Sequence, residues 1–242
     1  MSAPRFYLDH PLAPGARFNL PAGPARHAAR ALRLAVGDAI TLFNGKGGEF
    51  DARIERIQKD DVAISITGFS DRSRESPLRV VLAQGISSGE RMDYTLQKAV
   101  ELGVAAIQPI AARRSVVKLT GERADKRVAH WQGVVASACE QSGRNLVPRV
   151  ASPLALPDWL GQREAGRLLF LSPEASLRLA DLAPPTTTDC LVAGPEGGFE
   201  ADEIAALRAA GATPVRLGAR ILRTETAALA ALAAMQTLWG DF

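Results

Sequence analysis

Alternating apolar and polar positions dominate the first 70 residues and predict short strands. Ala39–Phe43 is rich in β-branched and aromatic residues, and Glu49–Ile57 and Val62–Ile66 place apolar side chains at every second position. Two shorter extended pieces come earlier, Phe6–Leu8 and Arg17–Leu20, and Pro24–Leu34 has a helical pattern that ends before Gly37. Several short strands separated by turn signals are typical of a small β-barrel, which we expect over residues 1–72.

The pattern changes after a polar stretch, Ser70–Pro77, which is the best candidate for a domain boundary. From residue 77 to 242, short apolar runs alternate with helical segments. The predicted strands are Leu78–Ala83, Ala105–Ala111, Leu168–Leu171, Cys190–Ala193 and Val215–Leu217. The predicted helices are Arg91–Leu102, Ala124–Ser142, Glu200–Ala210 and Glu225–Trp239. This succession predicts an α/β domain with a mainly parallel sheet, whose ligands bind beyond the carboxyl ends of the strands.

Composition adds mainly exclusions. The chain has 242 residues with 47% hydrophobic and 23% charged residues, an ordinary globular balance. Its longest apolar run, Ala227–Met235, is too short to span a bilayer, and its first residues lack a signal-peptide core. Two cysteines and three scattered histidines predict neither a disulfide scaffold nor a zinc site. We therefore expect a cytoplasmic protein with no membrane partner and no metal.

Charge is distributed unevenly along the chain. The formal net charge is +3, but residues 1–150 carry +7 and residues 151–242 carry −4. Such asymmetry suggests that the first part faces a polyanion such as nucleic acid. The alternative is an ordinary solvated surface, and the excess of arginine over lysine reflects genome composition equally well.

Two segments leave a predicted strand and enter a predicted helix with unusual chemistry. Ala193–Glu200 contains three glycines and a proline, yet it matches neither a phosphate-binding P-loop nor a dinucleotide fingerprint. Glycines there let a ligand approach the backbone, although a plain tight turn is the alternative. Leu217–Ala227 contains Arg220 and Arg223 in an otherwise acidic region, and Thr224 is a candidate N-cap. Surface ion pairs are the alternative for these arginines. A third short loop, Leu171–Glu174, follows another strand.

Together these loops resemble the cofactor loops of the SPOUT superfamily of S-adenosylmethionine-dependent RNA methyltransferases. More closely, the chain is similar to the ribosomal RNA small subunit methyltransferase E family. The segments that carry the resemblance are Pro4–Tyr7, His27–Arg33, Gln97–Val104, Ala138–Asn145, Gly194–Phe199 and Leu217–Ala227. They span nearly the whole chain, and the last two are highly specific when they occur together.

The resemblance implies an N-terminal PUA-like RNA-binding barrel and a C-terminal SPOUT α/β domain with a deep trefoil knot. It also implies methylation of N3 of one uridine in small-subunit (16S) ribosomal RNA, acting on the RNA or on the assembled 30S subunit, by a homodimer. Carried over by position, the residues expected to bind S-adenosylmethionine are Leu171, Ser172, Pro173, Gly194, Pro195, Glu196, Gly197, Gly198, Leu217, Gly218, Ile221, Leu222, Arg223, Thr224 and Thr226.

Methylation at N3 needs the uracil proton to leave, so a cation near the base and a carboxylate that accepts the proton are expected. We predict Arg223 as the cation with Arg220 as second choice, and Glu196 as a candidate base beside Glu225 and Glu140. For RNA contact, Arg26, Arg30 and Arg33 fall on one face of the predicted helix. The other predicted RNA contacts are Arg5, Arg113, Arg114, Lys118 and Arg144.

The sequence is also compatible with two alternative functions. One is another SPOUT methyltransferase with a transfer RNA or ribose target. The other is an RNA-binding assembly factor without turnover.

Overall fold

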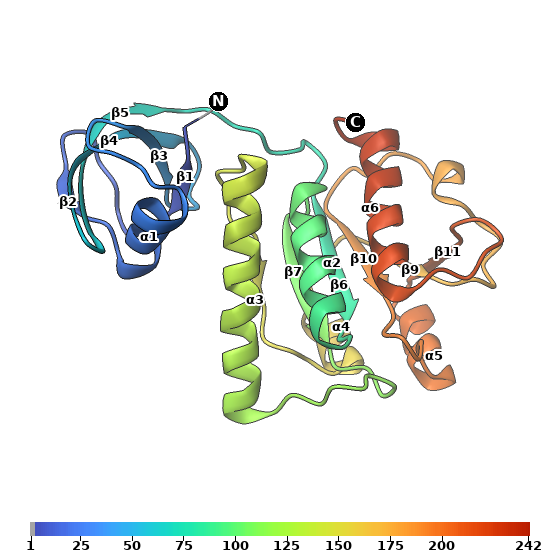
Figure 1. The fold of residues 1–242 in the computed structure, drawn as a ribbon. Coiled ribbons are helices and arrows are strands. Elements are labelled where there is room, and N and C mark those ends of the chain that lie inside the picture. The colour runs from blue at the N-terminus through green and yellow to red at the C-terminus, as the bar shows by residue number, and fades with distance from the viewer. Residues whose placement is uncertain (1–2) are drawn as a thin grey trace. The chain divides into compact units, whose positions relative to one another are not determined.

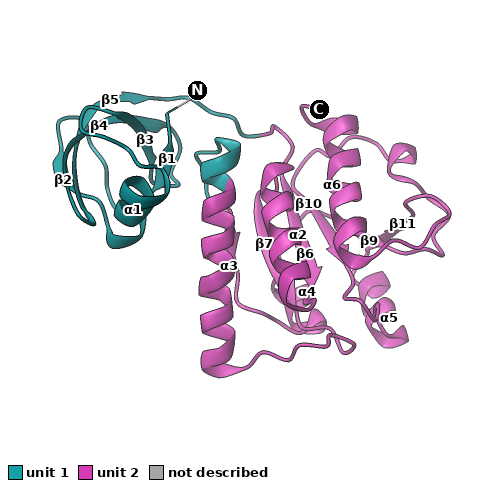
Figure 2. Ribbon diagram, in the orientation of Figure 1, with its two compact units in different colours: residues 1–75, 139–147 teal, residues 76–138, 148–242 magenta. Residues whose placement is uncertain are grey.

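A computed structural model describes residues 3–242 and divides them into two compact units. Unit 1 comprises residues up to Glu75 together with Cys139–Val147, and unit 2 comprises Ser76–Ala138 and Pro148–Phe242 (Figure 2). The sequence predicted a boundary between residues 72 and 77, but it placed 139–147 in the C-terminal domain. The structure instead groups this segment with the N-terminal unit.

Unit 1 is built on a five-stranded sheet in the order β1-β3-β4-β5-β2. The pairs β3–β4, β4–β5 and β5–β2 are antiparallel, whereas β1 and β3 run parallel. Its strands are β1 (Arg5–Tyr7), β2 (Arg17–Asn19), β3 (Ala39–Phe43), β4 (Glu49–Gln58) and β5 (Asp61–Ser70). Register shifts interrupt the long β4–β5 pair, and such bulges increase local twist. The sheet curves around a buried apolar core beside the short helix α1 (Ala22–Arg26) (Figure 1).

The predicted helix over 24–34 is shorter and less regular than expected. The α-helix α1 passes directly into a π-helical segment, η1 (His27–Ala31), and Arg33 has a left-handed backbone with φ of 53°. Because Arg33 lies beyond the helix, Arg26, Arg30 and Arg33 do not form the single helical face that regular spacing predicted.

Unit 2 contains a six-stranded sheet in the order β11-β9-β10-β6-β7-β8. Every paired neighbour in this sheet runs parallel, as the alternating pattern predicted. Its strands are β6 (Val80–Gly85), β7 (Ala106–Ile110), β8 (Arg149–Val150), β9 (Arg167–Leu171), β10 (Asp189–Ala193) and β11 (Thr213–Val215). The sequence missed β8, and it placed the last strand after Pro214, which lies inside β11. Proline is tolerated there because β11 is an edge strand.

Helices cover both faces of this sheet. They are α2 (Gly89–Glu101), α3 (Gly121–Ser142), α4 (Leu156–Gln162), α5 (Ala201–Ala209) and α6 (Thr224–Trp239), with a 3-10 turn η2 (Leu179–Asp181). In α2, the buried residues Met92, Leu96 and Val100 recur at helical spacing, and α2 packs against α6 (Figure 1). Trp159 of α4 and Leu207 of α5 pack in a second cluster against apolar side chains of β9 and β10. The short helix α4 and η2 were not predicted.

None of the helices in residues 3–242 is both long enough and apolar enough to cross a membrane.

Candidate functional site

A cavity of about 720 Å³ lies at the carboxyl ends of β9, β10 and β11. Its wall comes from the three segments that follow these strands, so the parallel sheet brings together loops that are far apart in sequence. Fourteen of the fifteen predicted cofactor residues line it, and Thr226 is not among the described residues that do. Thr226 is exposed one residue beyond Glu225, inside α6. The cavity therefore gathers all of the predicted cofactor residues except Thr226, and their contact with the cofactor stays a prediction.

The glycines of the segment Gly194–Gly198 serve two different purposes. Gly198 has a left-handed backbone with φ of 68°, and a side chain built there would meet no described atom within 4 Å. It therefore leaves backbone open to a ligand. A Cβ on Gly197 would lie 2.8 Å from Cβ of Arg114, so this glycine permits close packing of the protein on itself. Gly85 at the end of β6 is equally constrained, because its Cβ would lie 2.3 Å from the backbone nitrogen of Pro195.

A buried hydrogen-bond chain fixes the floor of the cavity. The Thr224 hydroxyl donates to the carbonyl of Gly194 at 2.5 Å and accepts from Nε2 of Gln84 at 3.0 Å. Gln84 is fully buried at the end of β6, and its Nε2 also donates to the carbonyl of Gly85. The sequence predicted Thr224 as the N-cap of the last helix, but α6 begins at Thr224 and its N-cap is Arg223. The Thr224 hydroxyl joins the ends of β6 and β10 to the start of the last helix.

Arg220 and Arg223 both line the cavity and are exposed. Neither forms an ion pair with any residue in 3–242, so the alternative of surface pairing does not apply to them. Between them lies Ile221, whose residue surface is 85% exposed. Two uncompensated guanidinium groups beside a cavity suit a ligand on which negative charge resides or develops.

Glu196 also lines the cavity, and one oxygen of its carboxylate is engaged while Oε2 is buried without a hydrogen-bond partner among residues 3–242. Its Oε1 accepts hydrogen bonds from the backbone N–H of Ser88 at 2.9 Å, from the Ser88 hydroxyl at 3.1 Å and from Arg91 at 3.2 Å. Burial by itself would raise the pKa of Glu196, but these bonds outweigh it and hold the pKa below its ordinary value. These hydrogen bonds favour the ionised carboxylate and weaken Glu196 as a proton acceptor, so it stays one of three candidate bases.

The two other candidate bases lie in different places. Glu225 lines the cavity in the first turn of α6, and its Oε2 is buried without a hydrogen-bond partner among residues 3–242. Glu140 belongs to unit 1 and accepts the backbone N–H of Tyr7 at 2.8 Å. Burial raises the pKa of Glu140, and the Tyr7 bond offsets this only in part. Glu140 therefore has a local structural role in unit 1.

The basic loop after β7 is partly engaged with acidic groups of unit 2. Arg113 pairs with Glu200 and with Asp202, and Arg114 donates to the carbonyl of Gly197 at 3.3 Å. Both side chains stay more than half exposed, and Lys118 is also exposed. Arg114 also lines the cavity, although the sequence predicted it only as an RNA contact.

Among the predicted RNA contacts of unit 1, Arg26, Arg30 and Arg33 are exposed. Arg30 forms a two-point ion pair with Asp60, with both nitrogen to oxygen distances at 2.6 Å. Its side chain remains 70% exposed, so a phosphate could compete with Asp60.

Arg5 and Arg144 do not fit the prediction that they contact RNA. Arg144 is buried and holds the Glu75 carboxylate through Nε and Nη2 at 2.9 and 2.6 Å. Arg5 is 12% exposed at its side chain and binds Glu49 and Asn145 at 2.5 and 2.6 Å. These donors are directed at internal acceptors, and together they attach the segment 139–147 to the rest of unit 1. In this structure both arginines therefore hold unit 1 together, and their side chains are not open to a phosphate.

Sequence reasoning missed several residues of the cavity wall. They include Arg91, Glu174, Phe199 and Arg216. Arg91 carries no local signal, because it lies on α2, more than one hundred residues before Glu196, and only the tertiary fold joins them. Glu174 could have been found, since it is the last residue of the predicted loop Leu171–Glu174 and was left out only of the cofactor contacts.

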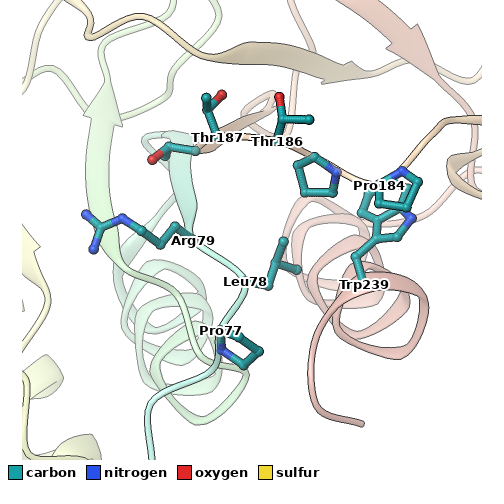
Figure 3. A pocket seen from close by; sticks show the side chains of 9 residues that line it. Pro77, Leu78, Arg79, Pro184, Thr186, Thr187 and Trp239 are labelled. Carbon is teal, nitrogen blue, oxygen red and sulfur yellow. The ribbon is translucent and has the colours of Figure 1, made fainter.

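A second, smaller cavity of about 390 Å³ lies elsewhere in unit 2, between the segments 77–79 and 184–188 (Figure 3). Trp239 also lines it, and Arg79 is its one charged lining residue. It gathers no set of groups suited to acid–base chemistry. In the part of the chain that the structure describes, no three His, Cys, Asp or Glu side chains are grouped to hold a metal.

Comparison with known families matches both parts of the chain. Residues 74–236 match the RNA methyltransferase domain, and residues 24–67 match the RNA methyltransferase PUA domain. The chain is 32% identical over 241 residues to Ribosomal RNA small subunit methyltransferase E of Buchnera aphidicola, covering 99% of this chain and 95% of that protein.

Solved structures match over the full length. A Ribosomal RNA small subunit methyltransferase E from Neisseria gonorrhoeae, bound to S-adenosyl methionine, is 45% identical with a TM-score of 0.93. A Legionella pneumophila structure in complex with the bound cofactor SAM is 38% identical with a TM-score of 0.96. In both comparisons 100% of each chain is covered.

Proposed function

This chain belongs to the ribosomal RNA small subunit methyltransferase E family, and we propose that it methylates N3 of one uridine in small-subunit ribosomal RNA. It is an S-adenosylmethionine-dependent RNA methyltransferase with a PUA-like N-terminal unit and a SPOUT-type α/β unit. The observation that carries the proposal is the single cavity built from the three strand-end loops, with two unpaired arginines in its wall.

The cavity suits S-adenosylmethionine in size and chemistry. Its volume of about 720 Å³ falls within the range of small-molecule sites. Apolar side chains such as Phe170 and Leu222 suit the adenine ring, and the open backbone at Gly198 can approach a ligand closely. Arg220 offers a partner for the carboxylate group of the methionine part.

When bound, S-adenosylmethionine supplies a methyl group on a positively charged sulfur. The protein must hold the uracil N3 in line with that methyl group, which is chiefly a matter of positioning. We assign Arg223 to stabilise the negative charge that develops on the uracil oxygens when N3 loses its proton, with Arg220 as the second choice.

Glu225 is the strongest remaining candidate for the base that accepts the N3 proton. It lines the cavity, and no donor holds it as Ser88 and Arg91 hold Oε1 of Glu196, although Oε2 of both carboxylates is buried without a partner among residues 3–242. Glu174 is the alternative carboxylate in the same wall, and it is exposed. Comparing single-turnover rates of Glu225→Gln and Glu174→Gln tests the assignment, because the base should lose about 100-fold or more in rate.

RNA contact is assigned to exposed basic residues. Arg26, Arg30 and Arg33 in unit 1 and Arg113 and Lys118 in unit 2 can neutralise phosphates without reading sequence. We further propose that the protein acts as a homodimer in the cytoplasm, where ribosomal subunits are its substrate. The trefoil knot stays a prediction from the family resemblance.

The decisive experiment is primer extension on small-subunit RNA from cells with and without this protein. A methyl group on N3 blocks the pairing face of uracil, so reverse transcriptase should stop at one site in the presence of the protein and read through in its absence. A stop that persists without the protein would refute the proposal. Purified protein and S-adenosylmethionine should restore the stop on subunits from the deficient cells. Methylation of transfer RNA or of ribose in that reaction would instead support another SPOUT activity, and binding without turnover would support an assembly factor.

A further inference from the structure

Ser88, immediately before α2, does not cap its own helix. Serine at an N-cap usually accepts a hydrogen bond from the backbone N–H of the second or third helical residue. Here no such side-chain bond is present within the described chain, although Ser88 occupies the N-cap position. Its hydroxyl and its backbone N–H both donate to Glu196 instead, which lies 108 residues later in the chain. A local stabilising bond is thus replaced by a contact to the glycine-rich segment.

Arg91, in the first turn of α2, adds a charge to this contact. It lies 3.2 Å from Oε1 of Glu196, so one carboxylate oxygen accepts three donors from the start of a single helix. The side chain of Glu196 is 19% exposed and that of Arg91 is 44% exposed. Partial burial strengthens the attraction relative to a fully solvated pair. The positive end of the helix dipole also favours a carboxylate at this position. We call Ser88, Arg91 and Glu196 the α2 latch.

The backbone beside the α2 latch is pressed together as well. Gly85 and Pro195 approach so closely that any side chain on Gly85 would collide with the Pro195 backbone. On the other flank, Arg114 contacts Gly197 and donates to its carbonyl. The segment Gly194–Gly198 is therefore held at both flanks by other parts of unit 2, while Gly198 remains open.

We propose that the α2 latch positions the segment Gly194–Gly198 for S-adenosylmethionine, so that Glu196 is a positioning residue and not the base. This inference rests on the proposed function, since it assumes that the cavity holds this cofactor. A segment with three glycines in five residues has high conformational freedom, which must be lost when it binds a ligand. The latch orders the segment in advance, and this lowers the entropic cost of binding.

The test separates binding from chemistry with purified full-length variants. Calorimetric titration with S-adenosylmethionine gives its Kd without RNA, and methylation of small subunits gives KM and kcat. Glu196→Ala should raise Kd and KM for S-adenosylmethionine by about 10- to 100-fold, the loss expected for hydrogen bonds to a charged group. At saturating cofactor, kcat should stay within about 3-fold of wild type, because the latch does not act on the reacting atoms.

Conservative variants show whether the role is specific. Glu196→Gln keeps an oxygen acceptor but loses the charge, so its Kd should lie between those of wild type and Glu196→Ala. Arg91→Ala should raise Kd in the wild-type background but have a much smaller effect when combined with Glu196→Ala, because the two share one interaction. Glu90→Gln is the matched control. It removes an exposed carboxylate next to Arg91, outside the latch, and should leave Kd and kcat unchanged.

Three results would overturn the proposal. The first is a folded Glu196→Ala variant whose Kd for S-adenosylmethionine is unchanged. This result would refute the positioning role of Glu196 but not the assignment of S-adenosylmethionine to the cavity. The second is a loss of kcat by 100-fold or more at saturating cofactor in both Glu196 variants, which would make Glu196 catalytic. The third is wild-type protein that binds no S-adenosylmethionine, which would refute the proposed function together with the latch. If Glu196→Ala does not fold, Glu196→Gln and Arg91→Ala give the same comparison.

Discussion

The hydrogen-bond chain beneath the cavity makes Thr224→Val an informative substitution. Valine has nearly the shape of threonine, so the change removes the hydroxyl without opening a void. The carbonyl of Gly194 then loses its donor at 2.5 Å, and Nε2 of Gln84 loses its acceptor at 3.0 Å. Gln84 is fully buried, so water cannot easily replace the lost partner.

The expected loss in free energy of unfolding depends on which hydrogen bonds each group retains. A buried polar group left without its partner costs about 1–3 kcal/mol. Gln84 loses less than this because its Nε2 still donates to the carbonyl of Gly85 at 3.0 Å. Adding the two contributions, we expect Thr224→Val to lower the free energy of unfolding by about 2–4 kcal/mol. Affinity for S-adenosylmethionine should fall too, since Thr224 and Gly194 both line the cavity.

Urea denaturation followed by tryptophan fluorescence measures this cost. Thr237→Val is the matched control, because Thr237 lies on the same helix, is exposed, and bonds only the carbonyl of Ala233 within its helix. It should change stability by less than about 0.5 kcal/mol. Adding Gln84→Leu to Thr224→Val should cost less than the sum of the single changes, with a coupling of about 1 kcal/mol. Equal effects of Thr224→Val and Thr237→Val would refute this account of the cavity floor.

The remaining predictions concern catalysis, RNA contact and pH. At saturating cofactor, Arg223→Ala should lower the single-turnover methylation rate by about 100-fold or more, and a near-wild-type rate would remove it from catalysis. Charge reversal at Arg30 and Arg33 should weaken methylation of ribosomal subunits and flatten its salt dependence without changing affinity for S-adenosylmethionine. If methylation and cofactor affinity both fall, or if neither falls, these arginines do not act as RNA contacts separate from the cofactor site. Because the pKa of Glu140 is raised, the folded state binds its proton more tightly, so this carboxyl makes the protein less stable as pH rises from about 4 through its folded pKa. Glu140→Gln can still accept the Tyr7 N–H, so denaturation at pH 7 should show stability equal to or above wild type, and a clear loss would refute the reasoning.

Much of the site could be predicted because parallel strands make neighbours of their carboxyl ends. The sequence placed glycine, proline and arginine directly after three buried strands, and pairing of β11, β9 and β10 brings these segments to one cavity. The family resemblance supplied the identity of the ligand, which spacing alone could not.

The contacts that the sequence did not predict share a different cause. Arg5 and Arg144 have the same side chain as the exposed Arg26, and nothing local separates them. Their partners, Glu49 and Glu75, are 44 and 69 residues away, and only folding makes them neighbours. The hydrogen bonds that Glu196 accepts were missed for the same reason, since their donors lie at the start of α2.

By itself the sequence determined the strand and helix succession, the parallel character of the second sheet and the loops that carry the site. These features depend on the periodicity of apolar side chains and on local backbone preferences, which act over a few residues. The tertiary structure decided which charges are free and which are paired, because charge pairing depends on distances between residues far apart in the chain. The tertiary structure leaves Arg220 and Arg223 without ion pairs among residues 3–242 in the cavity wall. It also bonds Glu196 to the start of α2 and places residues 139–147 in the first unit.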